Sequence, residues 1–233
     1  MKVKYPVNKG FTLIELLVVM TIIAVLATFG FSAFGKAKEM ANRTAAIANM
    51  KQIHLALTSY ATDNNDAYPD KKTATEPVAS SANVAFKRLI PSYISDEKAF
   101  AVKGSPSNTE NDGNTETEAE KLKAGENHYA MALGLTSASN SNYPLIWEGG
   151  ESGDDSYNPT WMKGKRDEWG GSWSDGSVLI VTVGGSVTQK KLDLPANAEA
   201  GEKASIVKDG SNTIFGLRTD GKGLAPEKGS STP

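Results

Sequence analysis

The stretch Lys9–Met20, KGFTLIELLVVM, decides how the rest of the chain is interpreted. It places one glutamate, Glu15, near the start of an apolar run that otherwise suits a lipid bilayer. The twenty residues after it, Leu16 to Gly35, carry no charge. At about 1.5 Å per helical residue, such a run just crosses a hydrocarbon core of about 30 Å. The sequence therefore predicts a membrane-spanning helix with an ionisable group at its entrance.

Charge around this segment indicates its orientation. Lys2, Lys4 and Lys9 stand against Glu15, a net +2 over residues 1–35, so the remainder of a chain with net charge -2 carries -4. Lysines before an apolar helix favour a cytoplasmic N-terminus. The acidic remainder has no basic patch, so nucleic acid is not expected as a main partner.

Two ordinary interpretations leave Glu15 unexplained. A cleaved signal peptide could end at the small-x-small triplet Ala33-Phe34-Gly35, but the apolar run exceeds the usual length of about 7 to 15 residues. A plain single-pass anchor is the second interpretation. An ionisable group in an apolar span costs about 2.5 to 3.5 kcal/mol and is usually retained for a partner. Neither alternative supplies that partner.

A third interpretation comes from resemblance. Residues Lys9–Leu16, KGFTLIEL, resemble the cleavage and N-methylation motif of type IV prepilins and type II secretion pseudopilins. In that family a membrane peptidase cuts after the glycine and methylates the new N-terminus. The resemblance implies that Gly10 ends the leader, that Phe11 becomes the first mature residue and that Glu15 is the fifth. It also implies that Glu15 pairs with the freed amine of a neighbouring subunit and so sets the stagger between subunits.

Beyond Lys36 the sequence becomes amphipathic. One face of the predicted helix recurs at steps of three and four: Ala37, Met40 or Ala41, Thr44, Ile47 or Ala48, Met50, Ile53 or His54, Leu57 and Tyr60. One helix from Phe11 to about Asn64 is predicted, about 80 Å long at 1.5 Å per residue. The turn residues Asp63–Asp66 and Pro69 predict its end.

The resemblance extends along this helix with one departure. Met50–Ile53, Tyr60–Asn64 and Tyr68-Pro69 are similar to the helix end of pseudopilins. Many family members have a proline where this chain has Ser32, flanked by Gly30 and Gly35. These glycines are consistent either with local loosening of the helix or with close helix contact.

The rest of the chain predicts a small antiparallel sheet of three to five strands. The clearest signal is Ser177–Leu192, two β-rich runs that meet at Gly184-Gly185 in a tight two-residue turn. Weaker strand candidates are Tyr143–Trp147, Ala204–Lys208 and Thr213–Leu217. The amphipathic half of the long helix is expected to cover this sheet. The predicted fold is α+β, the lollipop architecture that the resemblance implies.

Domain boundaries follow from these elements. We expect a leader at 1–10, a transmembrane or filament-core half of the helix at 11–35, an amphipathic half at 36–66 and a soluble head domain at 67–233. Within the head, Val84–Ile94 predicts a short helix that ends before Pro91. Lys103–Asn127 is a polar run, predicted to be a surface loop with one helical turn at Glu116–Lys123.

No catalytic or tightly bound cofactor site is predicted. The chain has no cysteine, two separated histidines (His54 and His128), and no nucleophile elbow, Walker loop or dinucleotide fingerprint. Calcium is considered at an acidic group, Asp154, Asp155 and Asp175, because loops of major pseudopilins bind it. Solvated acidic loops are the commoner case.

Four tryptophans, Trp147, Trp161, Trp169 and Trp173, cluster in one window. They could form an aromatic contact surface for a glycan or protein. The favoured interpretation is that the tryptophan side chains fill a small buried core beneath a loop.

The sequence thus predicts a structural subunit and not an enzyme. Expected partners are copies of itself, other pilin-like subunits, the prepilin peptidase and an inner-membrane assembly platform. The expected location is the bacterial inner membrane, with the head in the periplasm, and then a filament. The alternative is a membrane-anchored binding or adhesion protein outside the cytoplasm that never polymerises.

Overall fold

The computed structural model describes residues 11–72, 77–104, 111–149 and 173–192, without the side chains of 28–33. It also describes the backbone of three two-residue strands: β3, Trp161–Met162; β6, Lys203–Ala204; and β7, Gly223–Leu224. The chain divides into two units, an N-terminal unit at Met1–Ala41 and a globular unit at Asn42–Pro233.

A single helix, α1, runs from Leu13 to Asp63, 51 residues. The long helix predicted from the sequence is therefore confirmed. It ends where Asn65 and Asp66 adopt positive φ angles of 53° and 62°. The Asp66 N–H then donates to the carbonyl of Ala61 at 2.9 Å, which satisfies one of the free carbonyls of the last turn.

The sequence also predicts that the first half of this helix crosses a membrane. Within the residues that the structure describes, no helix combines the length and the apolar character that a membrane crossing requires.

The globular unit contains a five-stranded antiparallel sheet in the order β5-β4-β2-β1-β7. Its longer strands are β1, Tyr129–Ala132; β2, Pro144–Glu148; β4, Ser177–Thr182; and β5, Val187–Lys191. The two short strands β3 and β6 pair separately. The predicted α+β fold is confirmed, whereas β1 was not expected from the sequence.

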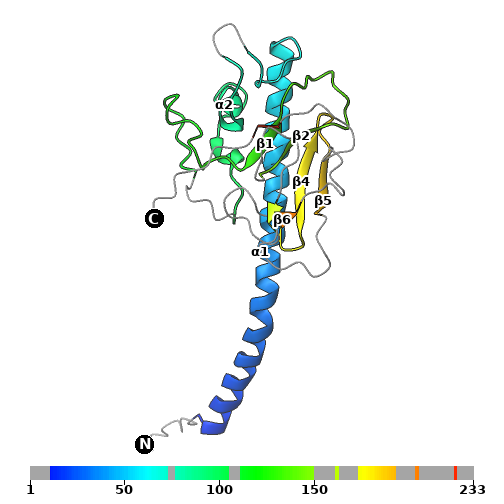
Figure 1. Cartoon of the computed structure of the whole chain (residues 1–233). Helices are drawn as coiled ribbons and strands as arrows, with labels where there is room; N and C mark the ends of the chain where they lie inside the picture. The colour runs from blue at the N-terminus through cyan, green and yellow to red at the C-terminus, as the bar shows by residue number, and fades with distance from the viewer. Residues whose placement is uncertain are drawn as a thin grey trace, which may run out of the picture. The chain divides into compact units, whose positions relative to one another are not determined.

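The amphipathic half of α1 packs with this sheet, as predicted. Figure 1 shows β1, β2, β4 and β5 beside the C-terminal half of the helix. Met50, Ile53 and Leu57 of α1 are fully buried and share one apolar cluster with Ile146 and Val181 of the sheet. Burial of such side chains contributes about 1.5 to 3 kcal/mol each.

The β4–β5 hairpin is present, but its turn differs from the prediction. The Gly185 N–H donates to the Thr182 carbonyl at 2.9 Å, and Gly185 alone of the two glycines has a positive φ, 78°. This is a three-residue loop, in which a β-turn is followed by one left-handed residue. The predicted two-residue turn is wrong, because the Thr182 N–H donates to the Ser186 carbonyl at 3.0 Å and the three residues between them form the loop.

The segment between α1 and β1 folds against the core in short elements. Helix α2, Ala82–Lys87, begins where the Ser81 hydroxyl accepts a bond from the Val84 N–H at 3.2 Å. It ends earlier than the predicted helix. The 3-10 helix η1, Glu97–Phe100, follows, and Phe100 packs on Phe86 with ring centroids 5.0 Å apart.

The polar run after η1 is only partly a surface loop. In its described part, residues 111–127, Leu122, Glu126 and Asn127 are buried. Asn83 of α2 donates to the carbonyls of Leu122 and Lys123 at 3.1 Å, and its amide oxygen accepts from Asn127 at 3.1 Å. These bonds hold the loop against α2, so polar residues of this run help to stabilise the fold.

Candidate functional sites

The N-terminal motif is described from Phe11 onward. Thr12 and Glu15 form a reciprocal cap at the start of α1. Glu15 Oε2 accepts from the Thr12 backbone N–H at 2.8 Å and from its hydroxyl at 2.7 Å, and the Glu15 N–H donates to Thr12 Oγ1 at 3.3 Å. Thr12 and Glu15 therefore satisfy two backbone donors that a helix start otherwise leaves free. This local role of Glu15 was not predicted from the sequence, although the T-x-x-E spacing of Thr12 and Glu15 signals it.

Apolar side chains surround this cap. In the N-terminal unit, every side chain from residue 11 to residue 27 is exposed. Phe11 is 73% exposed, Leu13 88% and Ile14 71%. A soluble monomer rarely exposes an apolar surface of this extent, so the segment requires lipid or protein around it.

One comparison with known proteins identifies this segment. Residues 6–31 match the family model described as the prokaryotic N-terminal methylation motif. The chain carries this motif. It is consistent with a type IV pilin-like or pseudopilin protein, and it suggests a membrane-anchored or surface protein of a structural kind. No curated protein and no solved structure matches the chain.

The motif does not by itself show processing. Gly10 lies outside the described residues, so cleavage after Gly10 and methylation at Phe11 stay predictions. The pairing of Glu15 with a neighbouring subunit also stays a prediction.

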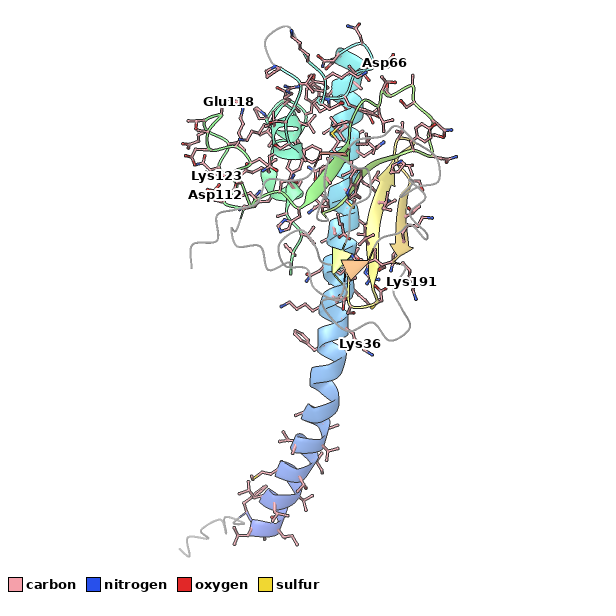
Figure 2. All side chains as sticks on the ribbon, viewed as in Figure 1. Lys36, Asp66, Asp112, Glu118, Lys123 and Lys191 are labelled. Atoms are coloured by element: carbon pink, nitrogen blue, oxygen red, sulfur yellow. The ribbon has the colours of Figure 1, made fainter. Side chains whose placement is uncertain are left out.

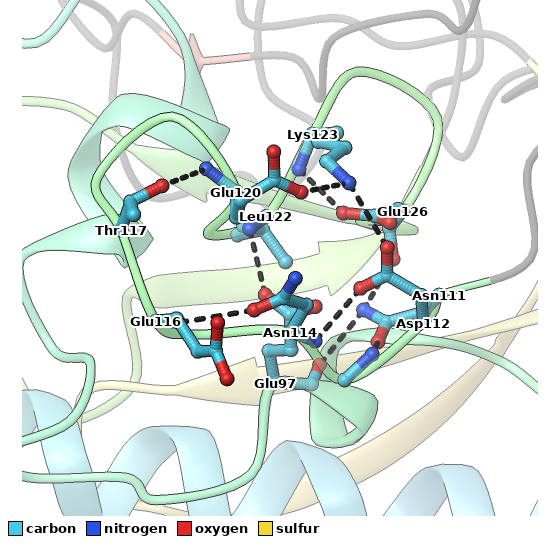
Figure 3. A network of polar contacts seen from close by, with 11 residues as sticks. Glu97, Asn111, Asp112, Asn114, Glu116, Thr117, Glu120, Leu122, Lys123 and Glu126 are labelled. Atoms are coloured by element: carbon cyan, nitrogen blue, oxygen red, sulfur yellow. Dashed lines mark hydrogen bonds and ion pairs between the residues drawn. The ribbon is translucent and has the colours of Figure 1, made fainter.

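A second site lies in the globular unit, where three carboxylates meet. Glu97 of η1, Asp112 and Glu126 each offer one oxygen, and these oxygens all lie within 4.8 Å of one another. Glu97 and Glu126 are buried, and Asp112 is exposed. Figure 2 shows Asp112 near Glu118 and Lys123 in the loop that precedes β1, and Figure 3 shows the network from close by.

Two of these carboxyl groups are desolvated. Burial raises the pKa of Glu97, and the Glu126 and Asp112 carboxylates raise it further, against the opposing bond from the Leu122 N–H. Burial also raises the pKa of Glu126. A hydrogen bond from Lys123 lowers the pKa of Asp112, so this exposed member is the most acidic of the three relative to its ordinary value.

The sequence prediction did not find this cluster. Its members come from three turns of the chain that only the fold brings together. One signal was available in the sequence: Asp112, Asn114 and Glu116 put oxygen-bearing side chains at alternate positions around Gly113, a pattern seen in cation-binding loops.

Of the three residues predicted from the sequence as calcium ligands, the structure describes only Asp175. Asp154 and Asp155 lie outside the described residues. Asp175 forms an ion pair with Arg43 at 3.0 Å and accepts from Gln189 at 2.9 Å. Calcium at these three residues stays a prediction.

The tryptophan window is partly described. Trp147 and Trp173 are buried in the core, as favoured from the sequence, and Arg43 stacks 5.0 Å above the Trp173 ring. The side chain of Trp161 and all of Trp169 lie outside the described residues.

Proposed function

We propose that this chain is the precursor of a filament subunit, a pilin or pseudopilin. It is cleaved after Gly10, methylated at Phe11 and polymerised through α1 into a type IV pilus-like or type II secretion filament. The observation that carries the proposal is the methylation motif at residues 6–31, with Glu15 at the start of the helix.

The exposed apolar surface supports assembly. Residues 13–27 of α1 present apolar side chains all round the helix, which indicates an apolar environment and not one packed face. Lipid provides that environment before assembly, and the same segments of neighbouring subunits provide it in a filament. A binding protein that merely needs attachment to a membrane gains only the helix cap from this glutamate, and that cap requires no neighbouring subunit.

Glu15 supplies the specificity of the contact. In the isolated chain, both bonds from Thr12 go to one oxygen, Oε2. A carboxylate has about four acceptor positions, so further capacity remains for a cationic partner. Cleavage after Gly10 creates such a cation, the amine of Phe11. In an apolar environment this pair forms only when a neighbouring subunit arrives at the correct axial stagger, so it sets the filament register.

The proposed partners follow from this chemistry. The prepilin peptidase acts at Gly10 and Phe11, copies of this chain and other pilin-like subunits pack along α1, and an inner-membrane platform assembles them. No catalytic role is proposed for the chain itself.

Replacing Glu15 tests the assembly step. In the native host, Glu15→Ala should leave the protein in the membrane fraction at normal abundance and greatly reduce the number of filaments in electron micrographs. Glu39→Ala removes the next acidic residue of the same helix and serves as the matched control, with filaments expected at wild-type number. Filaments of normal number and length from Glu15→Ala would contradict the proposal and favour an anchored binding protein.

A further inference from the structure

The two ends of the globular unit carry exposed side chains of opposite charge. At one end, where α1 stops, Asp63 and Asp66 are exposed. At the other end, the last two residues of β5, Lys190 and Lys191, are exposed. Figure 2 shows Asp66 at the first end and Lys191 toward the second. We call the two aspartates the acidic end and the two lysines the basic end.

Contacts with α1 fix how far apart these ends lie. Gln189, next to Lys190, donates to Asp175 Oδ2 at 2.9 Å, and Arg43 of α1 donates to the same oxygen at 3.0 Å. The basic end therefore lies beside Arg43, whereas the acidic end begins at Asp63 of the same helix. At 1.5 Å per residue, Arg43 and Asp63 are about 30 Å apart along α1. The aspartates and the lysines of one chain therefore cannot pair with each other.

The acidic end is unfavourable for its own helix. The last turn of α1 contains no basic residue, so Asp63 lies at the negative end of the helix dipole, where a cation is favoured. The Tyr93 hydroxyl donates to Asp63 at 2.9 Å, and the Ser137 hydroxyl donates to Asp66 at 2.6 Å. Within the described residues, neither carboxylate has an ion pair. Each carboxylate therefore retains acceptor positions for a cationic partner.

The basic end lies on an edge of the sheet. β5 is the outermost strand of the five, and lysines on an edge strand discourage a further strand from pairing there. Neither Lys190 nor Lys191 forms an ion pair in the part of the chain that the structure describes. A partner therefore meets this end through charge and not through a ladder of backbone hydrogen bonds.

One chain thus carries both halves of an end-to-end contact. A ligand of a single charge sign matches one end only, whereas a second copy of the chain matches both. The two surfaces differ, so such a contact is heterologous. Heterologous contacts that do not close into a ring generate open helical filaments.

We infer that the acidic end of one copy, Asp63 and Asp66, pairs with the basic end of another copy, Lys190 and Lys191, along the filament. The contact rests on the proposed function, since assembly through α1 brings the copies together. It adds a contact between globular units to the contact at Glu15. It also makes filament stability depend on salt, because ion pairs between exposed groups are screened.

Engineered disulfides test this contact. The chain has no cysteine, so introduced thiols report only on the chosen residues. Asp66→Cys and Lys191→Cys are combined in one chain in the native host, and the filaments are oxidised. A disulfide requires Cα atoms within about 7 Å, so these two thiols cannot join within one chain. We expect a ladder of dimers, trimers and longer multimers on a non-reducing gel, which a reductant removes.

Two matched controls define the pairing. Lys191→Cys alone should give monomers, because its thiol then faces Asp66 of the other copy. Glu118→Cys with Lys191→Cys moves the first thiol to the exposed loop before β1 and should also give monomers. In the test variant, Asp63 and Lys190 remain and keep part of the attraction between the copies.

Charge reversal tests the same contact without a cross-link. Lys190→Glu with Lys191→Glu should leave the melting temperature unchanged, because both side chains are exposed, and should greatly reduce the number of filaments. Adding Asp63→Lys and Asp66→Asn should restore the filaments, because the attraction between the ends is then reversed in sign and not lost. Asparagine is chosen at Asp66 because this residue has a φ of 62°, a conformation that asparagine adopts readily.

Two results would overturn the inference. One is the absence of multimers from Asp66→Cys with Lys191→Cys. The other is a wild-type number of filaments from Lys190→Glu with Lys191→Glu. Either result leaves the proposed function intact when the wild type forms filaments of the processed chain, whereas a wild type without filaments would overturn both.

Discussion

Glu148 shows how a single buried acid can organise the core. Its Oε2 accepts from the indole N–H of Trp173 and from the Leu179 N–H, both at 2.9 Å. Glu148 itself is buried in β2. One carboxylate therefore joins β2 to β4 and to Trp173 in the turn before β4.

Truncating this acid should cost more than neutralising it. Glu148→Ala leaves two buried donors without an acceptor, and we expect the free energy of unfolding to fall by about 2 to 5 kcal/mol. Glu148→Gln retains an oxygen in the same place and should cost much less. Urea denaturation of the full chain measures both, and equal losses in the two variants would contradict the role given to the acceptor.

Asp70 predicts a dependence of stability on pH. It is buried, its Oδ2 accepts from the Gly134 N–H at 2.7 Å, and burial raises its pKa despite Lys71 and Arg88 nearby. The folded chain therefore holds this proton to higher pH than the unfolded chain, whose aspartates titrate near about 3.9. The Asp70 contribution to stability is greatest below that value and is lost as the pH rises through the raised pKa.

Asp70→Asn isolates this effect, because an amide oxygen can still accept from Gly134. We expect the variant to be at least as stable as the wild type at pH 7, with the advantage shrinking as the pH falls toward 4. Urea midpoints at several pH values measure it. An advantage that stayed constant across this range would show that the titration of Asp70 does not contribute.

At the scale of elements, the hairpin is joined to α1 by a close contact. His54 Nε2 lies 2.9 Å from the Val183 carbonyl in the β4–β5 loop. A Cβ added at Gly185 would lie 2.9 Å from His54 Cε1, at a residue whose φ is 78°. Both the backbone conformation and the approach of the helix therefore require glycine.

Gly185→Ala should consequently destabilise the globular unit by about 1 to 2 kcal/mol, the usual cost of a left-handed conformation for a residue with a side chain. Gly35→Ala is the matched control, because nothing lies within 4 Å of a Cβ there and the residue is helical. Thermal unfolding compares the two. A loss in the control as large as in Gly185→Ala would contradict this explanation.

How well each element could be predicted depends on how local its signal is. The long helix follows from residue spacing over many turns, and the β4–β5 hairpin from β-branched runs on both sides of two glycines. Strand β1, Tyr129–Ala132, was missed because it is buried at every position and so shows no alternation of polar and apolar residues. The Glu97 cluster was missed because hydrogen bonds from Asn111 and Asn83, not sequence proximity, assemble it.

At the scale of the whole molecule, the two units have different requirements. The globular unit buries its own core, whereas the N-terminal unit exposes apolar side chains on every face of its helix. The exposed apolar surface of the N-terminal unit requires lipid or protein around it. Under the proposed function, processed subunits of the same class cover the segment that carries the methylation motif.

The most direct test is the intact mass and N-terminal sequence of the native protein, isolated from the membrane and filament fractions of the cells that make it. The account predicts a chain that begins at Phe11 with a methylated amine, so that Gly10 and the residues before it are absent. A chain that begins at Met1, or one that begins at Lys36, would contradict it, because neither presents the amine that Glu15 requires.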